Sequence, residues 1–483
     1  MAKDFIVAIE LGSSKITGMA GKKNPDGSIT ILAAASEDST SYIRKGVVYS
    51  IDKTTQGLSN IISKLKNSLQ ADITQVYVGI GGQSIHSVKN MVIKDLPMDA
   101  IVSQNMVNEL MDSNRNMTYP DYEIQDAITE EYKVDLQYQN DPVGIQASRL
   151  EGNFLNILWR RSFYRNLNKS FDNAGIAIAE TYLAPLVMAD NVLTEAEKRA
   201  GCVLVDLGAE TTTVSVYYRD KLRSIAVIPL GGDNITKDLE SLQMEACEAE
   251  RMKLKYSSAI TDVADIDPTA ILPIDSNRSV ESRRFIEVVE ARTLEIIENV
   301  KSFIPSEYID KLLGGIIITG GGSNMTNIEK AFREITGVEK IRIAKFVTLN
   351  INSKDSKPEL HHDGTMNTIL SLIARGDMNC AGNPFGNSLF DNQQFNAAFT
   401  TGTTNGTTTT QPNATTPHET EEERTKREEK ERIAKEEAER IKQEEETRKA
   451  KEEEERKKNS PIHRFFGSLK QFGRSLVEPE NNE

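Results

Sequence analysis

The sequence has little cysteine and no long apolar run, and both absences narrow the class of protein. Only three cysteines occur among 483 residues, Cys202, Cys247 and Cys380, and they form no CxxC pair and have no histidine at metal-ligand spacing. This pattern argues against a disulfide scaffold and a zinc site, and it fits a reducing cytosol. No apolar stretch approaches the roughly 18 residues that a membrane-spanning helix needs. Because Met1–Asp4 lead straight into a strand-like run, we expect no signal peptide.

Two common nucleotide-binding motifs and an excess of positive charge are also missing. Neither GxxxxGKS/T nor GxGxxG occurs, which excludes a P-loop and a dinucleotide fingerprint. The formal net charge is −14, and the residues after 390 carry only −4 of it, which leaves −10 on the first 390 residues. An acidic body repels phosphate backbones, so we expect no nucleic acid among the partners.

Composition changes sharply near residue 390. Residues 391–418 are rich in Thr, Asn and Gly, and residues 419–458 hold 31 charged side chains in 40 positions. Neither stretch has enough apolar surface to offset the entropy cost of folding, so we expect the folded body to end near residue 390. Pairs of Glu and Lys or Arg four residues apart favour a single helix over 419–458, with disorder as the alternative. We therefore interpret 391–459 as a linker.

The first 390 residues alternate strand-like and helix-like segments, which indicates an α/β architecture. Short β-branched runs predict strands at Phe5–Ile9, Gln75–Ile80, Cys202–Asp206, Thr213–Tyr217 and Gly315–Thr319. Amphipathic periodicity predicts helices at Gln56–Leu69, Ala184–Leu193, Ile235–Tyr256, Ser282–Phe303 and Asn324–Thr336.

One sequence pattern occurs twice. The segments Val7–Ser13 and Val203–Ala209 superpose at an offset of 196 residues. Each is an apolar strand that ends in an acidic residue, Leu, Gly and a small residue, and each leads into a second strand-like run. Any buried hairpin can have this pattern, but two copies with the acid and the glycine in register predict two related lobes.

Each copy contains what a phosphate chain needs when it is held between two lobes. A glycine turn lets backbone N–H groups approach phosphate oxygens without a Cβ in the way, and hydroxyls after the turn add donors. Glu10 and Asp206 precede the two turns and are candidates to hold Mg²⁺ through its water shell, because Mg²⁺ releases water reluctantly. Gly231 and Gly232 open a predicted helix, whose N-terminus is a further anion site. The candidate phosphate-binding residues are Gly12, Ser13, Ser14, Lys15, Gly208, Thr211, Thr212, Gly231 and Gly232.

A third glycine element follows a buried strand. Gly315–Thr319 runs into Gly320, Gly321 and Gly322, and a predicted helix opens at Asn324. Three consecutive glycines cost backbone entropy, so we expect something flat or charged to pack on them. The alternative is a tight strand-to-helix turn, which needs only one glycine.

In this order and spacing, the two turns and the glycine-rich loop resemble the actin/Hsp70/sugar-kinase superfamily. Finer motifs resemble its FtsA family of bacterial cell-division proteins, namely Thr181–Lys198, Ile228–Asp238, Ala249–Tyr256, Ile128–Val134, Asp141–Gly144 and Arg149–Gly152. The resemblance covers roughly residues 5–380. It implies ATP and Mg as ligands, with Glu250 and Lys253 at the ribose and adenine beside Gly320, Gly321 and Gly322. From the residues alone, Glu250 and Lys253 could equally be a solvated ion pair.

The second turn departs from the family pattern. Gly208 is followed by Ala209 and Glu210 where the family is usually glycine-rich, and the closing Asp is missing. A carboxylate at Glu210 would repel a triphosphate or bind metal. Position 10 is Glu where the superfamily more often has Asp. We therefore expect ATP binding with at most slow hydrolysis, and the sequence identifies no catalytic base.

The resemblance implies an α/β, actin-like two-lobed fold with an FtsA-type inserted subdomain, followed by the charged linker and a C-terminal amphipathic helix. The expected parts are 1–84 and 166–200 for the lobe 1 core with a closing helix at 364–385, 85–165 for the inserted subdomain, 201–234 and 313–363 for the lobe 2 core, and 235–312 for the lobe 2 small subdomain.

Residues 460–478 are predicted to form an amphipathic membrane-targeting helix. Ser460 and Pro461 supply an N-cap and an N1 start, and basic side chains flank an apolar arc. Three phenylalanines that no core covers need a partner, and the basic flank favours anionic lipids. Packing on the body or in a protein groove is the alternative. The candidate membrane residues are Ile462, Phe465, Phe466, Leu469, Phe472 and Leu476.

The residues and the resemblance together predict a structural adaptor for cell division. It would bind ATP, form filaments on the cytoplasmic face of the cell membrane at the division site, and tether FtsZ. The resemblance implies that the FtsZ C-terminal tail docks on 235–312 and that other division proteins contact 85–165. A pilus-assembly relative is the closest alternative, and a small-molecule kinase would need a catalytic Asp that the sequence does not identify. Cationic candidates for the FtsZ site are Arg251, Lys253, Lys255, Arg283, Arg284, Arg292 and Lys301.

Overall fold

The computed structural model of the chain describes residues 4–97, 100–262, 267, 269–353 and 358–382. The predicted linker at 391–459 and the predicted membrane helix at 460–478 lie outside the described residues, so both stay predictions. Among the helices that are described, none combines the length and the apolar character that a bilayer span requires.

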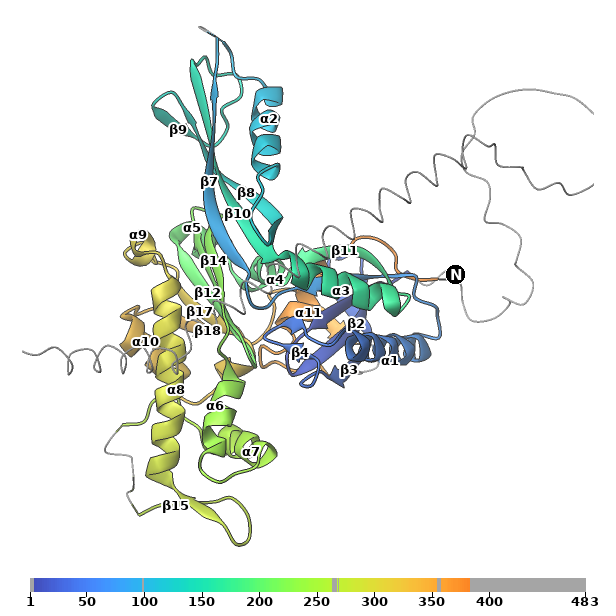
Figure 1. Cartoon of the computed structure of the whole chain (residues 1–483), viewed down its shortest axis with the longest axis vertical. Helices are drawn as coiled ribbons and strands as arrows, with labels where there is room; N and C mark the ends of the chain where they lie inside the picture. Colours follow the sequence, from blue (N-terminus) through green and yellow to red (C-terminus); the bar gives the residue numbers. More distant parts are fainter. Residues whose placement is uncertain (1–3, 98–99, 263–266, 268, 354–357, 383–483) are drawn as a thin grey trace, which may run out of the picture. The chain divides into compact units, whose positions relative to one another are not determined.

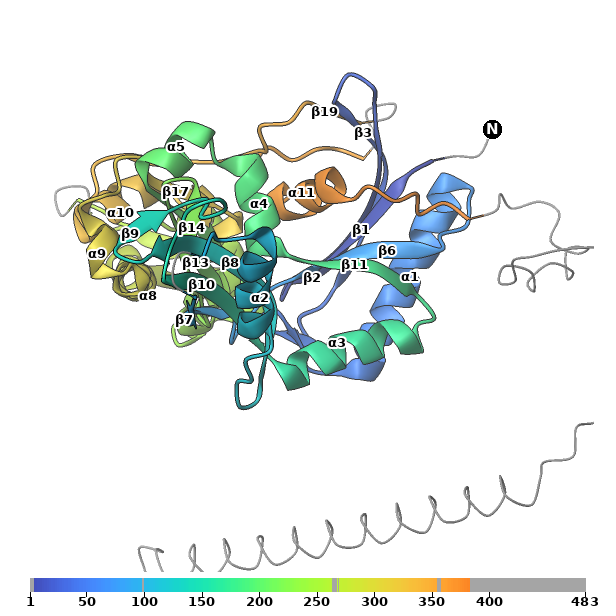
Figure 2. The ribbon, with the colours of Figure 1, turned by 90° about the horizontal axis from the view of Figure 1, so that it is seen from above.

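Lobe 1 is built on a mixed six-stranded sheet. Its strand order is β11 (Ala177–Leu183), β6 (Gln75–Ile80), β1 (Ile6–Leu11), β2 (Lys15–Lys23), β3 (Ile29–Asp38) and β19 (Ile351–Ser353). Residues 6–9 of β1 are all buried, as expected for a central strand that is covered on both faces. Helices α1 (Ile51–Leu69) and α11 (Asn367–Arg375) lie on opposite sides of this sheet (Figure 2).

Lobe 2 and the inserted subdomain share one nine-stranded sheet. Five strands belong to lobe 2, in the order β18 (Ile341–Ile343), β17 (Gly315–Thr319), β12 (Cys202–Leu207), β13 (Thr212–Tyr218) and β14 (Lys221–Ile228). The sheet continues into the insert through β7 (His86–Asp95), β10 (Arg149–Arg160), β8 (Tyr122–Val134) and β9 (Gln137–Gln139). Helix α2 (Gln104–Arg115) packs beside β7, β8 and β10 (Figure 1).

The internal repeat predicted from the sequence is confirmed in the strand order. The series β11-β6-β1-β2-β3 in lobe 1 matches β18-β17-β12-β13-β14 in lobe 2. The register matches too, because Ala8 pairs with Tyr77 and Leu204 pairs with Ile317, and positions 8 and 204 differ by the same 196 residues. Each lobe therefore presents its glycine turn at the same end of an equivalent hairpin.

The remaining elements are mostly helices that cover these sheets. They are β4 (Ile43–Arg44), β5 (Val47–Val48), α3 (Arg161–Asn173), α4 (Ala184–Val192), α5 (Glu195–Ala200), α6 (Gly232–Glu240), α7 (Ala246–Tyr256), β15 (Ile271–Pro273), β16 (Ser279–Glu281), α8 (Ser282–Phe303), α9 (Ser306–Ile309), the 3₁₀ helix η2 (Gly321–Asn324) and α10 (Ile328–Thr336). The predicted strands Gln75–Ile80 and Gly315–Thr319 and the predicted helix Ser282–Phe303 are confirmed to the residue.

Four predicted helices differ from the structure by more than one residue. Helix α1 begins at Ile51, five residues before the predicted start at Gln56, and the closing helix predicted at 364–385 is helical, within the described residues, only over Asn367–Arg375. The prediction of one helix over Ile235–Tyr256 fails because a turn at 241–245, with Gln243 in the left-handed region at φ 65°, separates α6 from α7. The turn lets both helices bury apolar side chains against the same cluster around Phe285 of α8. The helix predicted from Asn324 begins only at Ile328, because 321–324 form the 3₁₀ helix instead.

The described body ends beside its own first strand, in lobe 1. The amide of Cys380 donates to the carbonyl of Phe5 at 2.8 Å, and the amide of Gly382 donates to the carbonyl of Asp72, also at 2.8 Å. Between them, Ala381 forms an antiparallel bridge with Ile73. The last described residues are thus held by backbone hydrogen bonds along the edge of lobe 1.

Candidate functional site

All sixteen predicted nucleotide and metal residues line one cleft with a volume of about 1510 Å³, which both lobes border. They comprise the two glycine turns with their carboxylates, the start of α6, two side chains of α7 and the three-glycine loop. The full set is Glu10, Gly12, Ser13, Ser14, Lys15, Asp206, Gly208, Thr211, Thr212, Gly231, Gly232, Glu250, Lys253, Gly320, Gly321 and Gly322.

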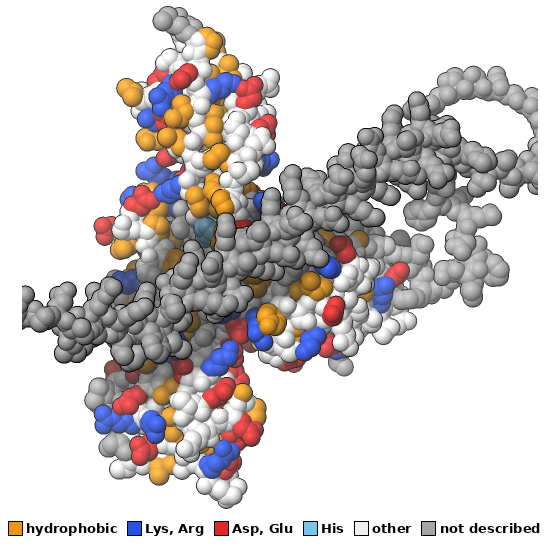
Figure 3. Space-filling model, in the orientation of Figure 1, with side chains coloured by type: hydrophobic (Ala, Val, Ile, Leu, Met, Phe, Trp, Pro, Cys, Tyr) orange, Lys and Arg blue, Asp and Glu red, His pale blue; other side chains and the backbone are white. Residues whose placement is uncertain are grey.

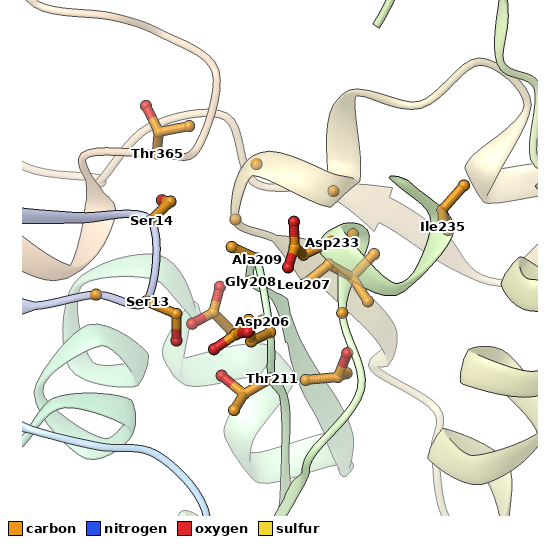
Figure 4. A pocket seen from close by; sticks show the side chains of 18 of the residues that line it. Ser13, Ser14, Asp206, Leu207, Gly208, Ala209, Thr211, Asp233, Ile235 and Thr365 are labelled. Atoms are coloured by element: carbon orange, nitrogen blue, oxygen red, sulfur yellow. The ribbon is translucent and has the colours of Figure 1, made fainter. Parts of the chain in front are cut away.

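The two glycine turns have the same geometry. The amide of Gly12 donates to the carbonyl of Lys15 at 3.1 Å, and the amide of Gly208 donates to that of Thr211 at 2.9 Å. A Cβ at either glycine would lie within 2.7–2.8 Å of that carbonyl oxygen, so only glycine closes the turn without strain. Figure 4 shows Ser13 and Ser14 facing Asp206 and Gly208 across the cleft.

The amides at the tips of both turns are available as donors. Within the described part of the chain, no acceptor is bonded to the backbone N–H groups of Ser13, Ser14, Ala209 or Glu210. Four N–H groups on two facing turns form a concave donor surface, which suits the oxygens of an anion. The hydroxyl of Thr212 is not part of this surface, because it donates to the carbonyl of Leu230 at 2.9 Å.

Glu10 and Asp206 bring two carboxylates into the base of the cleft, one from each lobe. Burial, together with the charge of Asp206, raises the pKa of Glu10 to about 7 against the opposing effects of Lys15 and a hydrogen bond from Thr368. Burial alone raises the pKa of Asp206 to about 6. Because the pKa of both carboxylates is raised, ionising both of them in the empty cleft is unfavourable. A cation bound between them would stabilise the ionised forms, so the pair favours cation binding.

Among the described residues, no three His, Cys, Asp or Glu side chains gather closely enough to hold a metal ion by themselves. The pair Glu10 and Asp206 therefore fits a cation that takes its other ligands from water and from a phosphate chain, as Mg²⁺ commonly does. The charge chemistry of the pair fits this group, because a divalent cation would offset the cost of ionising two buried carboxylates, as well as the repulsion of Glu10 by Asp206.

The start of α6 has another role than the sequence predicted. The amides of Gly232 and Asp233 donate to the carbonyls of Gly208 and Ala209 at 3.0 and 2.7 Å, and the amide of Gly231 donates to Asn234 Oδ1 at 2.9 Å. These amides were expected to form an anion site, but they are already bonded to the chain. The two glycines instead brace the lobe 2 turn, and a Cβ at Gly231 would lie 2.6 Å from its carbonyls.

Glu250 and Lys253 are not a solvated ion pair. Lys253 is buried, and its Nζ lies 2.6 Å from Glu250 Oε2, 2.9 Å from Thr236 Oγ1 and 3.0 Å from the carbonyl of Gly232. Thr236 also donates to Glu250 at 2.5 Å. This network joins α7 to the start of α6, so it fixes one wall of the cleft.

Two of the three glycines after β17 are required by packing. Gly320 has φ 84°, and a Cβ there would lie 2.3 Å from Asp206 Oδ1. A Cβ at Gly322 would lie 2.8 Å from the Cβ of Leu207, whereas Gly321 has room. The loop therefore packs directly on the residues that precede the lobe 2 turn, and a turn that needs only one glycine does not account for it.

Several cleft residues were missed by the sequence analysis. Asp363, Gly364 and Thr365 line the cleft from the segment before α11, and Thr368 of α11 is the partner of Glu10. A Cβ at Gly364 would lie 3.1 Å from the amide of Gly320, so this segment packs on the glycine loop. Gly364, Thr365 and Thr368 fall within the closing helix predicted at 364–385, and the Asp-Gly-Thr pattern at its start was the signal that could have assigned them to the cleft.

Comparison with known proteins places these features in a family. The family model for "Cell division protein FtsA" matches residues 203–362, and the model for "SHS2 domain inserted in FTSA" matches residues 82–158. Cell division protein FtsA of Porphyromonas gingivalis is 32% identical over 352 residues, which cover 71% of this chain and 74% of that protein. The FtsA protein of Neisseria meningitidis is 29% identical over 369 residues, covering 71% and 88%.

A solved structure supports the fold. The PilM-PilN type IV pilus biogenesis complex has a chain that superposes with a TM-score of 0.52 at 14% sequence identity, covering 77% of this chain and 98% of that one. At this identity the likeness concerns the fold alone.

Proposed function

The chain belongs to the FtsA family of cell-division proteins, with an actin-like α/β fold and an SHS2 insert, and on that premise we propose that it binds ATP and magnesium and links FtsZ to the membrane. The observation that carries the nucleotide part is the convergence of two equivalent glycine turns, two carboxylates and the glycine loop on one cleft. Family membership supports the division role.

Each group of cleft residues has a proposed task in holding the nucleotide. The free amides of the two turns would donate to the phosphate oxygens, and Ser13, Ser14, Lys15 and Thr211 would add side-chain donors. Bound magnesium would neutralise phosphate charge, held through water by the two carboxylates at the base of the cleft. The wall formed by α7 and the loop at 320–322 would face the ribose and adenine. We propose slow hydrolysis at most.

Calorimetric titration of the full chain with ATP, with and without Mg²⁺, tests the nucleotide site. We expect binding that strengthens with Mg²⁺, and we expect Asp206→Asn to remove most of the Mg²⁺ dependence. Asp112→Asn is the matched control, because Asp112 is an exposed carboxylate on α2, outside the cleft. Absence of any adenine-nucleotide binding by the unmodified chain would refute the proposal.

We propose that membrane attachment resides in residues 460–478, on anionic lipids of the cytoplasmic face. Full burial of an apolar side chain contributes roughly 1.5–3 kcal/mol, and insertion at a bilayer interface is only partial. One copy would therefore bind reversibly, and a filament of copies would bind firmly. Co-sedimentation with phosphatidylglycerol vesicles should disappear when 461–483 are deleted. If the truncated chain is found in the membrane fraction as much as the full chain is, this assignment is contradicted.

For the FtsZ tail, the structure reduces the cationic candidates in 235–312. Arg292 pairs with Asp238, and Arg283 pairs with Glu287. Arg251 and Lys301 donate to the carbonyls of Ile274 and Ile335, and Lys253 is buried against Glu250. Among the described residues, no carboxylate forms an ion pair with Lys255 or Arg284. We propose that these two cationic side chains bind acidic side chains of the FtsZ tail.

The inserted subdomain offers a separate contact surface. Met91 and Ile93 of β7 and Tyr138 of β9 are exposed, with fractions of 54%, 42% and 61%. Hydrophobic side chains gather over the insert in Figure 3. We propose this face for contacts with other division proteins or with the next copy in a filament.

A pilus-assembly role is the second candidate, because the solved pilus complex has the same fold. The curated relatives favour division. Binding of an FtsZ C-terminal tail peptide, measured by fluorescence anisotropy with Lys255→Ala and Arg284→Ala as variants, separates the two roles. A peptide that does not bind the unmodified chain would argue for the pilus role.

A further inference from the structure

The two-residue tip of the β4–β5 hairpin contacts the glycine turns of both lobes, which begin at Gly12 and Gly208. Lys45 and Gly46 have φ of 51° and 73°, as in the tight turns that join two antiparallel strands. The amide of Gly46 donates to Ser13 Oγ in the lobe 1 turn at 2.8 Å. The amide of Lys45 donates to Glu210 Oε2 in the lobe 2 turn at 2.6 Å. Each of these two successive backbone N–H groups therefore donates to a side chain in a different glycine turn.

Glu210 crosses the cleft to make this contact. It belongs to the lobe 2 turn, and its Oε1 lies 3.3 Å from Lys237 Nζ of α6, which also pairs with Asp233 at 2.8 Å. Its side chain is only 20% exposed. One carboxylate therefore accepts a backbone N–H from lobe 1 while it is held by a cation of lobe 2, and such charge-assisted bonds are stronger than neutral ones.

The same hairpin tip contacts the root of the inserted subdomain. The amide of Gln83 donates to the carbonyl of Lys45 at 2.8 Å. A Cβ at Gly46 would lie 2.5 Å from the Cα of Gly82, so the two backbones are in direct contact. The carbonyl of Gln83 in turn accepts from Nε1 of the buried Trp159, at the end of β10. Both connections of the insert, into β7 and out of β10, pass this point.

We propose that Glu210 is an interlobe latch, and that the Lys45–Gly46 tip passes its state to the root of the insert. When the latch is made, it holds the cleft closed and fixes Gly82 and Gln83. When it is broken, the tip loses its lobe 2 anchor, and the insert root is free to shift. The effect on nucleotide release rests on the proposed function, whereas the contact between the cleft and the insert does not.

Three variants separate the latch from a general effect of charge. Glu210→Ala removes both contacts, and Glu210→Gln keeps an acceptor for Lys45 but loses the charge that pairs with Lys237. Glu240→Ala is the matched control, because Glu240 is exposed, lines the same cleft and, in the described part of the chain, makes no side-chain contact with lobe 1.

The first measurement needs no nucleotide. Hydrogen–deuterium exchange of the full chain is followed at the amides of Lys45 and Gln83. We expect about tenfold faster exchange at both in Glu210→Ala, a smaller change in Glu210→Gln and none in Glu240→Ala. Exchange in the core strand Val203–Val205 should be unchanged, which shows that the variant is folded. Unchanged exchange at Gln83 in Glu210→Ala would overturn the relay.

The second measurement follows release of methylanthraniloyl-ADP after mixing with excess ADP. We expect release about tenfold faster from Glu210→Ala than from the unmodified chain, with Glu240→Ala unchanged. Slower release or tighter binding in Glu210→Ala would overturn the latch, because that result would mean that the carboxylate only repels phosphate. If the unmodified chain does not bind the probe, the proposed nucleotide function fails, and the exchange measurement still decides whether Glu210 controls the insert root.

Discussion

Replacing Glu10 by Gln should stabilise the nucleotide-free protein while it impairs magnesium-dependent ATP binding. Burial and the neighbouring charge of Asp206 raise the pKa of Glu10 from 4.5 to about 7, so the folded protein holds this proton more tightly than the unfolded chain does. Above about pH 7 the carboxylate is ionised in both states, and its buried charge destabilises the folded state. Gln keeps an oxygen that can accept the hydrogen bond from Thr368, and it removes the buried charge.

The size of the effect follows from the shift in pKa. The rise in the pKa of Glu10 from 4.5 to about 7 corresponds to about 3 kcal/mol, because each tenfold change in proton affinity is worth about 1.36 kcal/mol. Glu10→Gln should therefore raise the free energy of unfolding by about 3 kcal/mol at about pH 8, and by less than about 1 kcal/mol at about pH 5. For a body of roughly 380 residues, about 3 kcal/mol corresponds to about 4 °C in the midpoint of thermal unfolding.

The assay is thermal unfolding of the unmodified chain and the variant at several pH values without nucleotide. The unmodified chain should lose stability as pH rises from about 4.5 to about 7, because the folded state binds more protons in that interval. The variant should lose less over the same interval. Equal midpoints at about pH 8, or a gain that is as large at about pH 5, would refute the reasoning that an ionised Glu10 destabilises the empty cleft.

Three further predictions concern packing and the insert. Gly320→Ala should lower the free energy of unfolding by more than about 2 kcal/mol and abolish ATP binding, because the φ of 84° and the nearby carboxylate exclude a Cβ. Chemical denaturation measures the stability and calorimetry measures the binding. The control is Gly337→Ala, at a glycine with a similar φ and open space around it, which should keep ATP binding. Lys253→Met should weaken ATP binding without changing the fold, as seen by equilibrium dialysis and circular dichroism, and an unchanged affinity would exclude Lys253 from the site. Arg223→Met leaves Glu130 buried without its partner at 3.3 Å, so it should cost about 3–5 kcal/mol; limited proteolysis should then cut the insert faster, and Glu130→Gln in the same chain should restore resistance.

Much of the cleft could be predicted from the sequence because its determinants are local. A buried strand followed by a glycine that closes its turn requires only neighbouring residues, and this pattern occurs at both Gly12 and Gly208. The two copies are recognisable because the same hairpin was used in each lobe. The three-glycine loop was recognisable for a similar reason, since Gly320 needs a positive φ.

What could not be predicted depends on contacts between distant segments. The start of α6 has the sequence of an anion site, but its amides are bonded to Gly208 and Ala209, which lie more than twenty positions earlier. Glu210 was expected to repel phosphate or bind metal, and the amide of Lys45 that it binds is 165 residues away. Amphipathic periodicity continues through 241–245, so it could not show the break between α6 and α7.

The position where the chain leaves the described body has a mechanical consequence. Any tension applied through the residues beyond Gly382 must first enter lobe 1, along the short pairing of 380–382 with 72–74 and with Phe5. In this antiparallel contact several backbone bonds resist shear together, so the load is shared before it reaches the sheet. The pairing involves no residue of lobe 2, so a load that enters at 380–382 reaches lobe 2 only through lobe 1.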